Sequence, residues 1–91
     1  MVHPDKSDIF SVLNEKTGRR WILNKEEPGN IEIFSGKYKL NIVWEGDYWT
    51  LNLYDLNSEY GEDKPKISQG PIHDKDEIIK ILPGFLPDEM N

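Results

Sequence analysis

The sequence predicts an α+β fold: a meander of four to five antiparallel strands with a short C-terminal helix packed on one face. Three observations support this prediction. Apolar and polar residues alternate over 38–44 and again over 48–54, which is the period of two half-buried strands. Short apolar segments elsewhere in the chain are separated by turns that contain Gly or Pro. Over 74–82 the apolar spacing changes to that of a helix with one apolar side.

Length and composition favour one small domain. The 91 residues suffice for a single domain, 1–91, and three Trp, four Tyr and three Phe compensate for an apolar fraction of only 36%. Cysteine is absent, which excludes disulfides and thiolate metal sites and fits a reducing compartment. No apolar run has the length of a signal peptide or of a membrane span, so we expect a cytoplasmic protein with no membrane partner.

The N-terminal part predicts an arm and two strands. Residues 1–8 are polar with an early Pro, which is typical of a loose arm. The segment 9–14 (IFSVLN) is rich in branched and aromatic residues and predicts a first strand. A turn over 15–18, ending in Gly18, then leads into a second strand over 19–24.

A second set of breakers precedes the central hairpin. Residues 25–30 contain Pro-Gly-Asn and predict a turn, followed by a short strand over 31–34 that Gly36 interrupts.

The central hairpin has a predictable loop parity. Side chains that face each other across two strands share a face, so an even loop is needed to bring the two apolar sets together. The loop is placed at Glu45-Gly46 or over 44–47. It pairs Ile42 with Trp49, Leu40 with Leu51, and Tyr38 with Leu53.

The C-terminal part predicts a loop, an edge strand and the helix. Residues 55–65 are polar and acidic, and 66–69 fit a short edge strand. The helix over 74–82 begins at Asp74 as N-cap with Glu77 three residues later, and Pro83-Gly84 ends it. In this arrangement the core holds Trp21, Leu40, Ile42, Trp49, Leu51 and Ile78.

No residue pattern indicates catalysis, and we expect no enzyme, cofactor or metal. The two histidines, His3 and His73, stand outside any nucleophile–base motif. A calcium-type loop from Asp55 fails, because its Gly falls at position seven and position twelve is Lys66. His73 is followed by acids at 74, 76 and 77, a weak metal pattern that the preference of helix N-termini for acids also explains.

The second face of the hairpin is a candidate binding surface. In the predicted register it presents two tyrosines among lysines and amides, a composition that suits a protein interface or a stacking platform for single-stranded nucleic acid. An ordinary solvated sheet face has the same composition. Its residues are Lys37, Lys39, Asn41, Val43, Tyr48, Thr50, Asn52 and Tyr54.

Charge decides between the partner classes. The net charge is −6, and residues 46–91 account for all of it, which disfavours duplex nucleic acid as a partner. We therefore expect a small acidic, non-enzymatic protein-binding module, of the inhibitor or immunity-protein type, that contacts a basic surface. The alternatives are a binder of single-stranded nucleic acid on the sheet face and a structural subunit of a larger assembly. The expected contact residues are Tyr48, Tyr54, Glu59, Glu62, Asp63 and Lys39.

Overall fold

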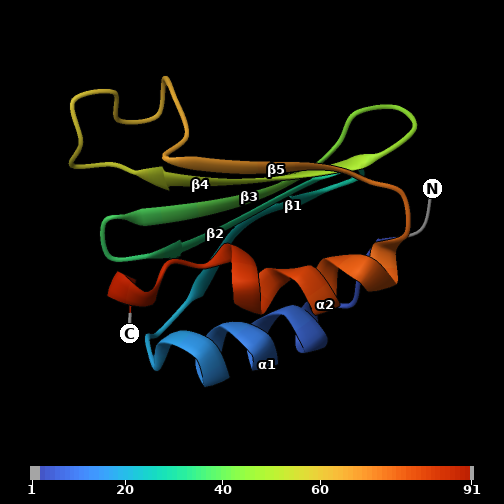
Figure 1. Cartoon of the computed structure of the whole chain (residues 1–91), viewed down its shortest axis with the longest axis horizontal. Helices are drawn as coiled ribbons and strands as arrows, with labels where there is room; N and C mark the ends of the chain where they lie inside the picture. The colour runs from blue at the N-terminus through green and yellow to red at the C-terminus, as the bar shows by residue number, and fades with distance from the viewer. Residues whose placement is uncertain (1–2, 91) are drawn as a thin grey trace.

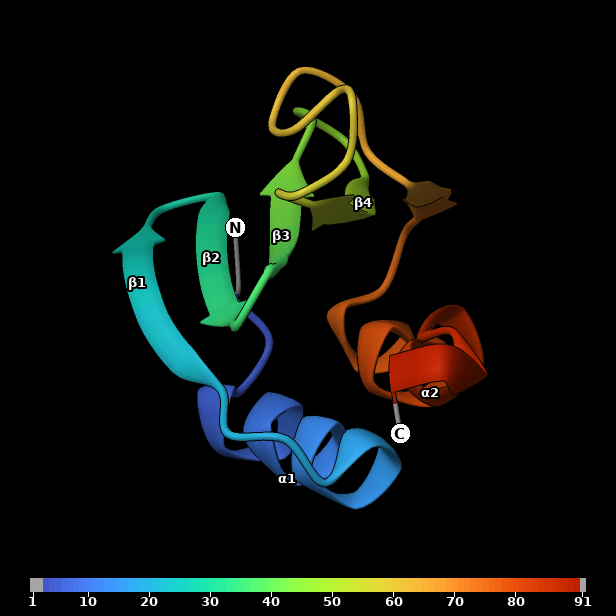
Figure 2. The ribbon, with the colours of Figure 1, turned by 90° about the vertical axis from the view of Figure 1, so that its left-hand side faces the viewer.

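The fold is a five-stranded antiparallel meander with both helices on one face. The computed structural model describes residues 3–90. The strands lie in the order β1-β2-β3-β4-β5, and the sheet curves around the two helices (Figures 1 and 2). The predicted α+β meander is thus confirmed, with a second, N-terminal helix added. The elements are α1 (Lys6–Thr17), β1 (Ile22–Glu27), β2 (Asn30–Ser35), β3 (Tyr38–Trp44), β4 (Trp49–Asp55), β5 (Ile67–Ile72), α2 (Lys75–Phe85) and the 3₁₀ helix η1 (Asp88–Met90).

Helix α1 replaces the strand predicted over 9–14. Asp5 caps its start by accepting a hydrogen bond from the Ser7 backbone N–H at 2.8 Å, and Gly18, with φ 65°, ends it. Ile9, Leu13 and Thr17 lie four residues apart and form its buried stripe. The arm expected over 1–8 is also wrong in part, since 6–8 form the first helical turn; residues 1 and 2 lie outside the described residues.

A buried polar network joins α1 to the sheet. Thr17 Oγ1 donates to the Leu13 carbonyl at 2.7 Å and accepts from Trp21 Nε1 at 2.9 Å. Both polar groups of the buried Trp21–Thr17 contact are therefore satisfied. This network fixes the entry into β1, which starts at Ile22 and runs to Glu27, so the turn predicted over 25–30 shrinks to Pro28 and Gly29.

The β3–β4 hairpin has the predicted even loop in a register two residues away from the prediction. Trp44 pairs with Trp49, Ile42 with Leu51, and Leu40 with Leu53, so the loop is 45–48. A hydrogen bond from Glu45 N–H to the Tyr48 carbonyl at 2.8 Å closes it. A shift of two leaves every side chain on its predicted face. All six predicted core residues are accordingly buried: Trp21, Leu40, Ile42, Trp49, Leu51 and Ile78.

Helix α2 begins as predicted and ends one turn later. The Asp74 carboxylate accepts from the Asp76 N–H at 2.9 Å. The helix continues through Pro83 and Gly84, because Phe85 extends the buried stripe begun by Ile78 and Leu82. The gain from burying this ring outweighs the helix-breaking tendency of the Pro-Gly pair.

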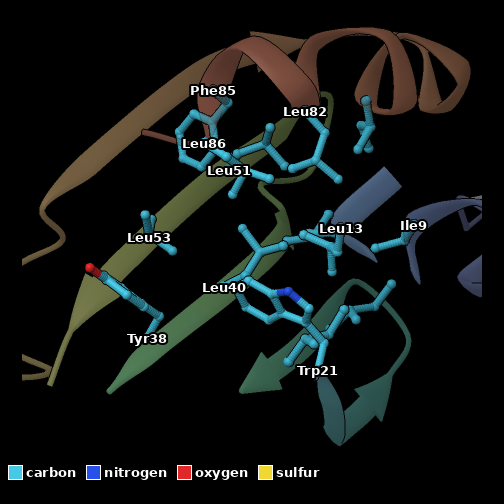
Figure 3. Packing of buried hydrophobic residues seen from close by; sticks show 14 of the residues in the cluster. Ile9, Leu13, Trp21, Tyr38, Leu40, Leu51, Leu53, Leu82, Phe85 and Leu86 are labelled. Atoms are coloured by element: carbon cyan, nitrogen blue, oxygen red, sulfur yellow. The ribbon is translucent and has the colours of Figure 1, made fainter. Parts of the chain in front are cut away.

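The core lies between the helices and one face of the sheet. Figure 3 shows side chains of α1 and α2 pointing at Leu40, Leu51 and Leu53 of the central strands, with the Trp21 ring beside them. Within residues 3–90, no helix is long and apolar enough to cross a membrane. Among the residues that the structure describes, no helix lies on the opposite face of the sheet (Figure 2).

Candidate functional site

The helix-free face of the sheet consists of side chains in cross-strand rows. The row nearest the β2–β3 turn runs from Ile22 through Phe34 and Lys39 to Tyr54. It is the most apolar row, and Ile22 at its β1 edge is 57% exposed. The next row is polar and runs across the sheet through Lys25, Glu32, Asn41, Asn52 and Ser68.

The polar row satisfies its own hydrogen bonds. Lys25 Nζ lies 3.6 Å from a Glu32 carboxylate oxygen, and Ser68 Oγ donates to Asn52 Oδ1 at 2.8 Å. Asn41 Nδ2 donates to Asn30 Oδ1 at 2.7 Å and to a backbone carbonyl. These contacts stabilise the sheet and occupy groups that a ligand would otherwise use.

Lys39 is the least accessible charged residue of this face. It is only 8% exposed, because the Tyr54 ring lies beside it and loop 56–66 covers it. Its ammonium is 4.4 Å from the Tyr54 ring centroid and donates to Glu62 Oε2 at 3.0 Å. The structure thus brings together three of the predicted contact residues, and the lysine among them already has its counter-ion.

The other predicted contact residues separate into two places. Glu59 and Asp63 lie exposed in the same loop as Glu62. Tyr48 lies at the opposite end of β4, six residues from Tyr54, which corresponds to about 20 Å along a strand. Its ring packs edge-on against His73 with centroids 6.4 Å apart. The predicted set is therefore not one continuous surface.

Tyr48 belongs to the end of the molecule where the N-termini of both helices, the β1–β2 turn and the β3–β4 loop meet (Figure 1). We call this the acidic end and define it by its charged residues. It carries nine carboxylates and two lysines, a net of −7 against −6 for the whole chain. They are Asp5, Lys6, Asp8, Glu26, Glu27, Glu45, Asp47, Asp74, Lys75, Asp76 and Glu77.

Most of these carboxylates lack an ion pair within residues 3–90. Glu26 pairs with Lys6 at 3.1 Å and Asp76 with Lys75 at 2.9 Å, which leaves seven. The hydrogen bond from Lys75 to Asp76 raises the pKa of that lysine. Asp5 and Asp74 cap the helices, and the helix dipoles stabilise acids at both N-termini. The acids at the C-terminal end of β1 and in the β3–β4 loop have no such role.

Aromatic rings underlie the acidic end. Trp44 and Trp49 pack with centroids 5.2 Å apart, and the His3 ring meets Trp49 edge-on at 5.6 Å. His3 Nε2 also accepts the Gly29 backbone N–H at 2.8 Å, which holds the N-terminal segment on the β1–β2 turn. Sequence reasoning missed this site because its residues come from four separate segments that only the sheet order and the parallel helices bring together.

The opposite end of the molecule is close to neutral. We call it the loop end: loop 56–66, the β2–β3 turn, the helix C-termini and η1 (Figure 1). Lys16 pairs with Asp88 at 3.1 Å, and Lys37 lies 3.6 Å from Asp55. Lys66 pairs with Glu89, a hydrogen bond that raises the pKa of the lysine. A surface hollow of about 360 Å³ lies at the loop, lined by Asp55, Ser58, Tyr60, Lys64, Pro65 and Lys66.

Within residues 3–90, no group of three or more His, Asp or Glu side chains is arranged to hold a metal ion. Comparison of the chain with protein-family models, with curated proteins and with solved structures finds no match.

Proposed function

We propose that this chain is a non-enzymatic protein-binding module whose acidic end contacts a basic surface of another protein. The observation that supports this proposal is the concentration of net charge: the acidic end holds −7, while the rest of the molecule sums to +1. A one-sided charge distribution steers a partner of opposite charge toward one orientation and raises its association rate.

Partly buried aromatic side chains next to the carboxylates complete the proposed surface. Tyr48 and Trp44 are partly accessible, and Glu45 and Asp47 flank them in the β3–β4 loop. Aromatic side chains tend to carry the binding energy of an interface, while charges at its rim tune association. A module of this kind inhibits by occupying the basic surface, which is the action of an immunity-type protein.

A protein partner is favoured over nucleic acid in the conformation described. Carboxylates repel phosphate, and affinity for nucleic acid depends on free Lys and Arg side chains. The two lysines of the face predicted as a platform, Lys37 and Lys39, are both ion-paired, to Asp55 and Glu62. That face thus offers these two cations only in neutralised form.

The test compares two triple variants. A partner is first isolated on immobilised protein, and its association rate is then measured over a range of salt concentrations. Neutralising the acidic end with Glu27→Gln, Glu45→Gln and Asp47→Asn should slow association by about tenfold or more at low salt and flatten the salt dependence. The matched control neutralises the loop with Glu59→Gln, Glu62→Gln and Asp63→Asn and should leave the rate within about twofold.

The loop triple also tests the contact set predicted from sequence. If only the loop triple slows association, Glu59, Glu62 and Asp63 form the contact and the acidic end does not. If neither triple changes the rate, the proposal of charge-guided protein binding is wrong. Tyr48→Ala should speed dissociation by about tenfold. Tyr54→Ala is the matching variant at the loop end, and its dissociation rate is compared with that of Tyr48→Ala.

A further inference from the structure

Lys39 at the loop end is a buried cation whose counter-ion comes from a loop. It lies on the helix-free face and is nevertheless only 8% exposed. Burying a charge is unfavourable unless an opposite charge or hydrogen bonds compensate it. The carboxylate of Glu62 supplies this compensation at 3.0 Å, and the Tyr54 ring adds a cation–π contact at 4.4 Å. Without Glu62, Lys39 would need another anion.

Glu62 is held in place by little else. Its side chain is 65% exposed. In the described chain, the other polar contacts of residues 59–65 stay inside the loop. Gly61 N–H donates to Ser58, Asp63 N–H donates to the Tyr60 carbonyl, and Lys64 lies over the Tyr60 ring. Figure 2 shows this loop on the side of the sheet away from the helices. One ion pair therefore fastens its middle to the sheet.

The aromatic neighbours of Lys39 suit a nucleotide. Phe34 and Tyr54 are the cross-strand neighbours of Lys39 on β2 and β4, each about 4.8 Å away between backbones. The cation therefore has an aromatic residue on either side. Proteins bind single-stranded nucleic acid by stacking its bases on aromatic rings and neutralising its phosphates with nearby cations.

We propose that loop 56–66 is a strap over a binding position for single-stranded nucleic acid, and that Glu62 occupies the place of a phosphate. The closed strap keeps Lys39 neutralised and Tyr54 partly covered. A phosphate that displaces Glu62 frees the loop and lets a base stack on Tyr54 or Phe34. This activity lies at the end opposite the acidic end and does not depend on the protein-binding function proposed above.

The test measures the affinity for a fluorescein-labelled oligothymidylate by anisotropy at low salt. Glu62→Gln should bind about tenfold or more tightly than the wild type, because the competing carboxylate is gone and Lys39 is left without a counter-ion. Glu59→Gln is the matched control: it makes the same charge change in the same loop without touching Lys39, and should bind within about threefold of the wild type. Adding Lys39→Met to Glu62→Gln should remove the gain.

Hydrogen exchange of the loop amides shows whether the strap has opened. Exchange over 58–64 should be faster in Glu62→Gln than in Glu59→Gln, while the sheet amides stay protected. If the loop opens without a gain in oligothymidylate affinity, the ion pair has only a structural role and the nucleic-acid proposal is wrong. Equal affinities of Glu62→Gln and Glu59→Gln overturn it as well.

Discussion

The two ends of this small sheet differ in how they treat charge. At the loop end, lysines pair with carboxylates from other elements: Lys16 with Asp88, Lys39 with Glu62, and Lys66 with Glu89. At the acidic end, seven of nine carboxylates lack an ion pair within the described residues. Since surface ion pairs contribute little to stability, the difference concerns association more than folding. The lysines named at the loop end are thus neutralised within the chain, whereas most carboxylates of the acidic end remain available to a partner.

The difference also shows that net charge has to be summed over residues that are close in the fold and not over stretches of sequence. Along the chain, residues 46–91 hold the whole net charge and 1–45 hold none. In the fold, the acidic end takes five carboxylates from the first half and four from the second. It excludes the acidic loop 56–66, whose Glu62 is neutralised by Lys39. Comparing the two halves of the sequence therefore gives the right sign of the charge but the wrong place for it in the molecule.

Both ends rest on one core, and Leu51→Ala tests which face of the sheet forms that core. Leu51 is fully buried between the sheet and the helices. Its truncation should lower the free energy of unfolding by about 2–5 kcal/mol in chemical denaturation. Ile22→Ala, on the exposed side of β1, should cost about 0.5 kcal/mol or less. A loss below about 0.5 kcal/mol for Leu51→Ala would mean that the assignment of the sheet faces is wrong.

The core was predictable because period-two alternation fixes the faces of a strand pair whatever the exact register. The predicted hairpin register was wrong by two residues. It placed Trp49 opposite Ile42, where the structure has Leu51, and it moved neither residue to the other face. Helix α1 was missed for the opposite reason. Its six-residue apolar segment suited a strand, and the capping residues Asp5 and Gly18 lay outside the segment considered. Those caps, with Ile9, Leu13 and Thr17 four residues apart, were the available signal.

The candidate site was less predictable than the core. The residues of loop 56–66 are close in sequence, so their proximity in space could be predicted without knowing the fold. The acidic end combines Glu27, Glu45 and Asp74 through the strand order and the parallel direction of the two helices. Without α1, which sequence reasoning took for a strand, neither its N-terminal acids nor His3 could be placed there.

Thr17→Val should weaken the attachment of α1 where the two helices end. The valine keeps the shape of the side chain and removes the oxygen that accepts from Trp21 Nε1 at 2.9 Å. A buried indole N–H without a partner costs about 1–3 kcal/mol, which denaturant unfolding would measure. Thr17→Ser retains the hydroxyl and should recover most of the loss. Equal stability of Thr17→Val and wild type would show that water replaces the threonine.

Asp74→Ala should lower the free energy of unfolding by less than Thr17→Val does, although it removes a helix cap. Loss of the hydrogen bond to the Asp76 N–H should destabilise the protein by about 1 kcal/mol. The same change relieves repulsion among the unpaired acids of the acidic end, so the cost should grow as salt screens that repulsion. Asp74→Asn, which keeps the cap and removes the charge, separates the two effects in thermal melts. If Asp74→Asn is no more stable than the wild type at low salt, the repulsion at the acidic end does not exceed the stabilisation of Asp74 by the helix dipole.

The smallest expected effect is that of a chelator, which should leave the melting temperature unchanged. His73 with Asp74, Asp76 and Glu77 is the weak metal pattern of the sequence, and a bound cation would neutralise part of the acidic end. Two of these carboxylates already have other partners. Asp74 accepts the Asp76 N–H, and Asp76 Oδ1 accepts a hydrogen bond from Lys75 at 2.9 Å. Coincident melts with and without a strong chelator would show that no metal stabilises the fold, so that these carboxylates remain available to a protein partner. A drop of several degrees would assign them to a metal, and because bound metal cancels negative charge, the contrast between the two ends would then depend on the metal supply.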